Sequence, residues 1–144
     1  MKKIMTILLS AVMVVSMAFS ITACDKKEVS ENIDPENTVV LKDNEIVGTG
    51  KTSFPLTIVD EEGNSIKITV KTDKEFLGDA LIEAHLIAGE NSEHGLYVKT
   101  VNGITVDYDK DQKYWALYID GEYATKGIDA IKVKEETKYT LKVE

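Results

Sequence analysis

Residues 114–127 read YWALYIDGEYATKG, and this stretch decides the expected fold. Its first half is mostly aromatic or aliphatic, a composition that favours a β-strand. Asp120-Gly121 is a dipeptide typical of a two-residue hairpin turn. Residues 122–124 continue the chain as the partner strand, and the segment of small residues that ends at Gly127 lets another backbone or a ligand come close. The stretch therefore predicts an antiparallel hairpin.

Alternation along this strand assigns its side chains to two faces. Trp115, Leu117 and Ile119 are the apolar set, and we expect them to face the core. Tyr114 and Tyr118 then face outward, with further tyrosines at positions 97, 108 and 123 on adjacent strands. An amphipathic patch of this kind suits a flat, partly polar ligand. Ordinary cross-strand pairing in a half-exposed sheet explains the same pattern.

Other strand patterns surround this hairpin. Residues 54–60 and 66–72 flank a turn at Gly63, and the second run alternates strictly between apolar and polar side chains. Residues 95–101 and 104–108 flank Asn102-Gly103, a strong hairpin signal. Two more runs, 38–41 and 137–143, also read as strands. With one helix between the hairpins, the order predicts an α+β domain of antiparallel strands packed on a single helix.

That helix is expected over residues 74–88. Thr72 and Glu75 have the spacing of a capping box, and apolar residues follow at helical spacing, at positions 77, 80, 81, 84 and 88, up to Gly89. Ile82 and Leu86 point away from this stripe. Either another segment, such as the loop at residues 90–95, covers them, or they form an exposed apolar patch for a ligand or a partner.

The N-terminal residues have the layout of a secretory signal. Two lysines precede an apolar run, and residues 1–23 end beside Cys24, the one cysteine of the chain. This arrangement resembles the lipobox of bacterial lipoproteins, in which that cysteine carries lipid; the alternative is plain signal cleavage. We expect residues 24–37 to form a lipidated flexible tether and residues 38–144 to form the globular domain. The predicted location is the bacterial cell surface, on the extracytoplasmic side of the membrane.

The charge of the chain limits the classes of partner that it is expected to bind. Removing residues 1–23 takes away two of the 17 basic residues and none of the 25 acidic ones, which leaves a net charge of −10. The chain contains no arginine. Nucleic acid is therefore excluded as an expected partner, because its binding depends on cationic neutralisation of phosphates. With Cys24 lipidated, no disulfide is available, and the domain relies on packing alone.

The sequence carries no enzymatic motif. It lacks a nucleophile elbow and a phosphate-binding glycine loop, and we predict that the protein is not an enzyme. A candidate divalent-metal site is formed by two imidazoles and two carboxylates, at His85, Glu90, Glu93 and His94. Their spacing matches no known metal motif, so they are equally explained as boundary and surface residues.

Three stretches together resemble a known family. LGDAL follows the extended residues 70–72, then come GLYVKTVNGI and YWALYIDGEYATKGID, in that order. This pattern is similar to a domain of bacterial surface lipoproteins that is itself similar to the C-terminal β-domain of transcobalamin and intrinsic factor, which closes over cobalamin. The resemblance implies a β-grasp-like fold of the group that binds soluble ligands. Glu135-Glu136 stands where the family has a Gly-Asp turn, and Asp120 stands where it prefers asparagine.

The resemblance implies a lipid-anchored, non-catalytic domain that binds a soluble ligand, with cobalamin or another corrinoid as the leading candidate. The expected ligand-binding residues come from two strands and their turns: Tyr97, Asn102, Tyr114, Trp115, Tyr118 and Tyr123. One alternative is a lipoprotein that binds a divalent metal through His85 and His94. Another is a surface adhesion or interaction module that presents the tyrosines, or Ile82 and Leu86, to a protein partner.

Overall fold

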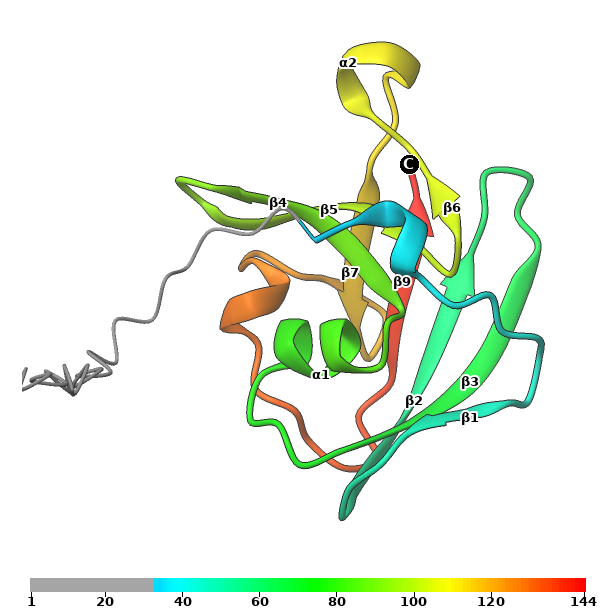
Figure 1. Ribbon diagram of the computed structural model, residues 1–144, viewed down its shortest axis with the longest axis vertical. Coiled ribbons are helices and arrows are strands. Elements are labelled where there is room, and N and C mark those ends of the chain that lie inside the picture. The colour runs from blue at the N-terminus through cyan, green and yellow to red at the C-terminus, as the bar shows by residue number, and fades with distance from the viewer. Residues whose placement is uncertain (1–32) are drawn as a thin grey trace, which may run out of the picture.

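Two β-sheets and a central helix form the part of the chain that the computed structural model describes, residues 33–144 (Figure 1). The larger sheet has the strand order β1 (Ile46–Gly48), β3 (Ser65–Thr72), β2 (Thr52–Val59), β9 (Tyr139–Val143), β7 (Trp115–Ile119), β8 (Glu122–Tyr123). The smaller sheet has the order β4 (Ile87–Ser92), β5 (Gly95–Val101), β6 (Ile104–Thr105). The helical elements are η1 (Pro35–Asn37), α1 (Leu77–Glu83), α2 (Tyr108–Asp111) and η2 (Ile128–Ala130).

This arrangement confirms the predicted α+β class. Most strand pairs are antiparallel, as expected, while β1–β3 and β2–β9 are parallel. The two predicted hairpin turns are present: Asn102 and Gly103 have φ values of 50° and 79°, and Asp120 and Gly121 have 50° and 88°. Positive φ at both central residues is what a two-residue hairpin requires. No helix in residues 33–144 is long and apolar enough to cross a membrane.

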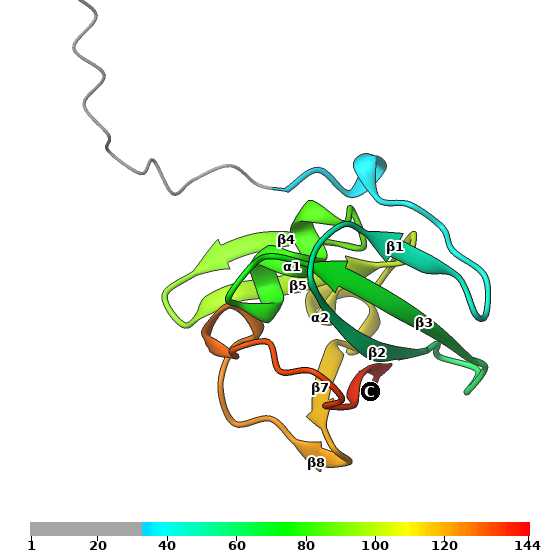
Figure 2. The same ribbon diagram turned by 90° about the horizontal axis from the view of Figure 1, so that it is seen from below.

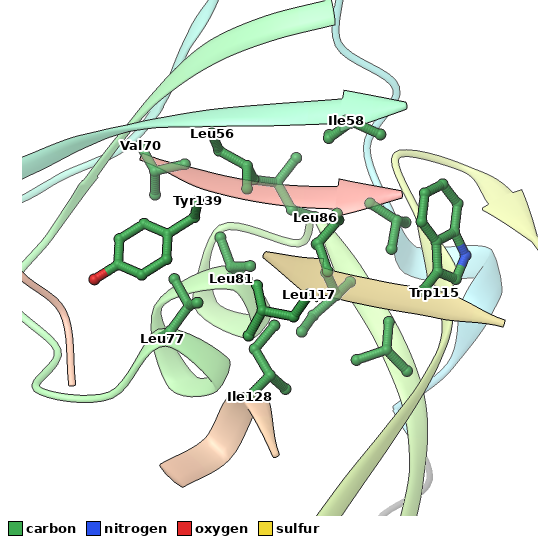
Figure 3. Close-up of a cluster of buried hydrophobic side chains, with 14 of the residues drawn as sticks. Leu56, Ile58, Val70, Leu77, Leu81, Leu86, Trp115, Leu117, Ile128 and Tyr139 are labelled. Carbon is green, nitrogen blue, oxygen red and sulfur yellow. The ribbon is translucent and has the colours of Figure 1, made fainter. Parts of the chain in front are cut away.

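The core lies between α1 and the larger sheet (Figure 3). Leu77 and Leu81 of α1 are fully buried against strand residues such as Leu56. Trp115 is 7% exposed and lies in the core, as the alternation of its strand predicts. Tyr139 packs edge to face on a phenylalanine of β2, Phe54, with ring centroids 5.1 Å apart.

The helix is shorter than predicted. It ends at Glu83, and His85 adopts a left-handed conformation with φ 55°, after which Ile87–Ser92 form β4. Gly89 does not end a helix. It stands in β4 at a register shift, where a Cβ would lie 2.1 Å from the Tyr97 carbonyl oxygen. Pairing with β5 therefore overrides the helical pattern of residues 84–88.

The predicted capping box is also absent. Thr72 is buried at the end of β3, and its hydroxyl accepts a hydrogen bond from the Lys74 amide at 2.9 Å. The residue that precedes α1 is Phe76, whose side chain makes no capping bond. Glu75 instead forms an ion pair with Lys132. The sequence spacing was right for a cap, but strand pairing extends through Thr72 and delays the start of the helix.

Ile82 and Leu86 are covered by other parts of the chain, as the first interpretation predicts, but the covering segment is not the suggested loop. Leu86 is fully buried, because the chain turns at His85 and directs it into the core. Ile82 is half-buried beside residues 33–38, and not beside the loop at 90–95. The two residues therefore do not form an exposed apolar patch.

The first described residues lie against the domain. The Ile33 amide donates to the Gly89 carbonyl at 3.1 Å, and the Val39 amide donates to the His85 carbonyl at 2.8 Å. Residues 33–37 of the predicted tether are thus ordered, with η1 capped by Asp34. The expected strand at residues 38–41 is an irregular segment, and β1 was not predicted. The predicted signal, Cys24 and residues 25–32 lie outside the described residues.

Candidate functional site

Four of the six predicted ligand-binding residues meet at one hollow, here called the tyrosine pocket. It has a volume of about 150 Å³ and lies between β5, β7 and the segment that follows β8. The predicted residues that line it are Tyr97, Tyr114, Trp115 and Tyr123. The rest of its wall is mostly apolar and includes Leu96, Val98, Leu117, Ala124, Ile128 and Leu141, with Lys126 and Gly127 at the border.

Short strands create this pocket. β8 has only two residues, and the last bond along its edge runs from the Ala124 amide to the Leu117 carbonyl at 2.8 Å. The chain then leaves the sheet, so nothing pairs with β7 beside Trp115 on that side in the described residues. β5 of the smaller sheet approaches this uncovered edge without pairing to it. An uncovered strand edge offers backbone hydrogen-bonding groups as well as side chains.

Three tyrosines line the tyrosine pocket. The pKa of Tyr114 is raised, first by the neighbouring Tyr123 side chain and then by desolvation. Tyr123 is 53% exposed, whereas Tyr97 and Tyr114 are half-buried. The phenols thus present flat apolar rings with a polar rim at the border between core and solvent. Such a surface suits a ligand that is flat and partly polar.

Tyr118 and Asn102 do not line the pocket. The Tyr118 hydroxyl donates to Oε1 of Glu144 at 2.6 Å, and its ring packs edge to face on Tyr123. Asn102 is 7% exposed, and its side chain accepts from the Leu41 amide at 2.7 Å and donates to the Leu41 carbonyl at 3.2 Å. Both residues therefore have structural partners. The Asn-Gly turn signal located Asn102 correctly but did not reveal that its side chain binds a segment 61 residues away.

Trp115 has one unusual feature. Its indole N–H is buried without a hydrogen-bond partner, and no other buried side-chain nitrogen or oxygen in residues 33–144 lacks one. An unsatisfied buried donor costs roughly 1–3 kcal/mol. The same residue lines the tyrosine pocket.

The proposed metal ligands are not brought together. His85 follows α1 in a separate hollow of about 320 Å³, whereas Glu93 and His94 form the turn beyond β4. Eight residues separate the two histidines, and six of them form β4, which spans about 17 Å at 3.3 Å per residue. Glu90 instead pairs with Lys99 at 2.9 Å. Within residues 33–144, no group of three or more His, Cys, Asp or Glu side chains is placed to hold a metal ion.

Two further hollows, which sequence reasoning missed, adjoin the tyrosine pocket. One, of about 520 Å³, lies along the β7–β8 turn and is lined by Tyr123, Ala124 and Lys126 among others. The next, of about 360 Å³, lies beside residues 130–139 and is here called the lysine pocket. Their walls come from residues 119–139, largely from turns and irregular segments without regular periodicity, so no periodic pattern signals them.

Comparison with known proteins agrees with this fold. Residues 75–144, which include every residue that lines the tyrosine pocket, match the family model described as "Domain of unknown function (DUF4430)". No curated protein matches the chain. A solved structure of a "putative metal binding protein" from Ruminococcus gnavus ATCC 29149 is similar, with a TM-score of 0.61 and 26% identity over 65% of this chain and 97% of that one.

A second solved structure is haptocorrin in complex with Cbi. It aligns with a TM-score of 0.47 and 20% identity, over 65% of this chain and 25% of that one. This chain therefore spans about a quarter of haptocorrin. Residues 75–144 match a domain family of unknown function, and the chain is similar in fold to the Ruminococcus gnavus protein.

Proposed function

We propose that this protein is a non-catalytic binding domain that holds a soluble small-molecule ligand in the tyrosine pocket. One observation carries the proposal, namely that four predicted residues from three strands and the position just before β7 line one hollow: Tyr97, Tyr114, Trp115 and Tyr123. An apolar hollow with a few convergent polar groups is the usual form of a small-molecule site. The phenol hydroxyls supply those polar groups here.

The size of the pocket restricts how a ligand binds. At about 150 Å³ it is smaller than the roughly 300–1,000 Å³ of sites that enclose a whole ligand. A flat ligand would therefore insert one edge and extend over the adjoining hollows. A corrinoid is the leading ligand class because of the sequence resemblance to the transcobalamin β-domain, and haem is a planar comparison ligand.

We place the domain on the extracytoplasmic side of a bacterial membrane, held by lipid on Cys24. Eight residues separate Cys24 from Ile33, which allows a distance of at most about 30 Å in an extended chain. Ile33 is bonded to β4, and β8 lies on the opposite side of the domain (Figure 2). A lipid at Cys24 would thus hold the domain from the side remote from the β8 edge and its hollows. Cys24→Ser is expected to release the protein from membranes without changing its melting temperature.

A divalent metal ion is the second candidate ligand. It is favoured by the similarity to the Ruminococcus gnavus protein, whose name refers to metal binding. The geometry of residues 33–144 does not allow both histidines to bind one metal ion, since His85 and His94 lie at opposite ends of β4. A metal would then bind to one histidine at a time with few protein ligands. Binding of this kind is weak compared with a site of four ligands.

The test is thermal melting of residues 25–144, which contain every described element. The protein is melted alone and with cobalamin, cobinamide, haem, Zn²⁺, Co²⁺ or Ca²⁺. A ligand that binds only the folded state at 100 times its Kd adds about 2.7 kcal/mol, a shift of several degrees for a domain of this size. A shift with a planar ligand supports the proposal. A shift with metals alone favours the second candidate, and a shift only with a partner protein favours an interaction module.

A further inference from the structure

Three lysines line one hollow beside the proposed site. The lysine pocket, of about 360 Å³, has Lys126, Lys132 and Lys134 in its wall and only one carboxylate, Asp120. This grouping runs against the composition of the chain, in which 25 acidic residues outnumber 17 basic ones. A cationic hollow in an acidic protein attracts anions locally even though the net charge repels them.

A buried tyrosine fixes the segment that carries two of these lysines. Tyr139 is 1% exposed, and its hydroxyl donates to the Lys132 carbonyl at 3.2 Å and accepts from the Lys134 amide at 3.1 Å. Between them, Val133 is half-buried against the core, whereas Lys132 and Lys134 are exposed. In an extended segment, alternate residues lie on the same side. The two lysine side chains therefore leave the same side of a backbone that is held in place.

The carboxylates nearby leave two of the lysines without a partner. Asp120 accepts a hydrogen bond from the Lys138 amide at 2.9 Å, and Lys132 forms an ion pair with Glu75. In the described part of the chain, no carboxylate lies within ion-pair distance of Lys126 or Lys134. The acidic residues that follow, at positions 135 and 136, do not line the hollow.

Lys126 connects this hollow to the tyrosine pocket. It lines the lysine pocket, the tyrosine pocket and the hollow between them. The intermediate hollow also shares Tyr123 with the tyrosine pocket and Ile131 with the lysine pocket. The three hollows thus adjoin one another around residues 123–126. A ligand that occupies the aromatic end has a lysine-lined surface directly beside it.

We propose that Lys126 and Lys134 bind a carboxylate or phosphate group of the ligand whose flat part occupies the tyrosine pocket, an inference that rests on the proposed function. A lysine ammonium is a compact point charge on a flexible stem, which suits an anion without a fixed orientation. Both lysines are exposed. Their contribution is therefore modest and falls with rising salt.

The matched probes are riboflavin and flavin mononucleotide, which share one planar ring system and differ by a phosphate group. Binding to residues 25–144 is measured by flavin fluorescence at low ionic strength. We expect the mononucleotide to bind roughly tenfold more tightly, as two exposed charge contacts allow. The double variant Lys126→Gln/Lys134→Gln is expected to remove this difference. The control Lys67→Gln/Lys71→Gln changes two exposed lysines of β3 and is expected to keep it.

The inference would be overturned if the two flavins bound with equal affinity, or if both double variants kept the difference in affinity. In either case, flavin binding itself would still support the proposal that a flat ligand occupies the tyrosine pocket. If neither flavin binds, the anion site is tested by titrating the protein with inorganic phosphate and monitoring the amide chemical shifts. The anion site is supported if phosphate shifts amide signals within residues 119–139 and the Lys126→Gln/Lys134→Gln variant abolishes these shifts. The lack of flavin binding would then count against the flat-ligand proposal and not against the anion site. The absence of such shifts overturns the inference.

Discussion

The ring of Tyr118 packs edge to face on the ring of Tyr123, with centroids 5.6 Å apart and planes at 86°. The Tyr118 hydroxyl is at the same time bound to Glu144 at 2.6 Å. Tyr118 therefore supports Tyr123 from outside the tyrosine pocket, while Tyr123 lines it. Two tyrosines that the sequence pattern treats as equivalent thus have different roles, and they provide a matched pair for mutation.

Tyr114→Ala and Tyr123→Ala are expected to weaken binding of any planar ligand by roughly tenfold or more, because each removes an aromatic wall worth about 1–3 kcal/mol. Tyr118→Phe is the matched control, since it keeps the ring that packs on Tyr123 and removes only the hydroxyl. It is expected to change the affinity less than twofold. Isothermal calorimetry of the three variants measures this. Equal loss in all three would show that the ligand binds elsewhere on the sheet.

The pair of Tyr118 and Glu144 predicts a dependence of stability on pH. The pKa of Glu144 is lowered from its ordinary value of 4.5, first by the Tyr118 hydroxyl and then by Lys142. A carboxyl group whose pKa is lower in the folded than in the unfolded protein stabilises the fold at pH values above its unfolded pKa. This stabilisation is lost as the pH falls through the pKa of the folded state. The melting temperature of the wild type should exceed that of Tyr118→Phe by a constant amount between about pH 5 and about pH 9. That gap should shrink below pH 4.5, and a gap that widens in acid would contradict the assignment.

Asn102 is expected to stabilise the fold and not to contact the ligand. Asn102→Ala removes both bonds to the Leu41 backbone and places alanine at φ 50°. The expected loss in free energy of unfolding is about 2–3 kcal/mol. Asn91→Ala, at an exposed position of β4, should cost less than about 0.5 kcal/mol. Urea unfolding measures both. If Asn102→Ala kept its stability but lost ligand affinity, Asn102 would belong to the binding site.

Gly89 sets the approach of β4 to β5 and thus the position of Tyr97. In Gly89→Ala, the added Cβ would lie 2.1 Å from the Tyr97 carbonyl oxygen, so the strands must separate. The expected destabilisation is about 1–3 kcal/mol, together with weaker ligand binding. At Gly63 a Cβ meets no atom within 4 Å, although φ is 85°. Gly63→Ala should therefore cost only about 1 kcal/mol of backbone strain and leave binding unchanged.

The histidines give a direct test of the metal alternative. Because His85 and His94 lie at opposite ends of β4, each is expected to bind Zn²⁺ alone and weakly. In a calorimetric titration, His85→Asn and His94→Asn should each remove one independent weak event. A single tight site that disappears in either variant would mean that both imidazoles reach one ion, contrary to the separation of the two elements.

The positions of most strands along the chain were predictable because turn chemistry and alternation are local. Asn102-Gly103 and Asp120-Gly121 adopt the positive φ values that their turns require, and Trp115 is buried as its strand period indicates. The helix boundary was not predictable in the same way. Residues 84–88 have helical spacing, yet β4 gains backbone pairing with β5, which only the assembled sheet provides.

The site was predictable in part for a related reason. The period of two placed Tyr114 on an outward face, and the adjacent strands were expected to bring Tyr97 and Tyr123 near it; all three line the pocket. The same pattern could not show that Tyr118 is bound to Glu144 or that Asn102 binds Leu41, because both contacts join distant segments. Lys126 and Lys134 lie in irregular segments, where no period assigns a side chain to a face.

The most direct test of the central claim uses the single tryptophan of the chain. Its indole N–H gives one resolved signal in a ¹H–¹⁵N spectrum, and this donor belongs to a residue in the wall of the tyrosine pocket. The first ligand that raises the melting temperature is titrated into labelled protein. The account predicts that the indole signal shifts and saturates with the same Kd as the thermal stabilisation. Stabilisation with an unmoved indole signal would contradict it and place the ligand elsewhere.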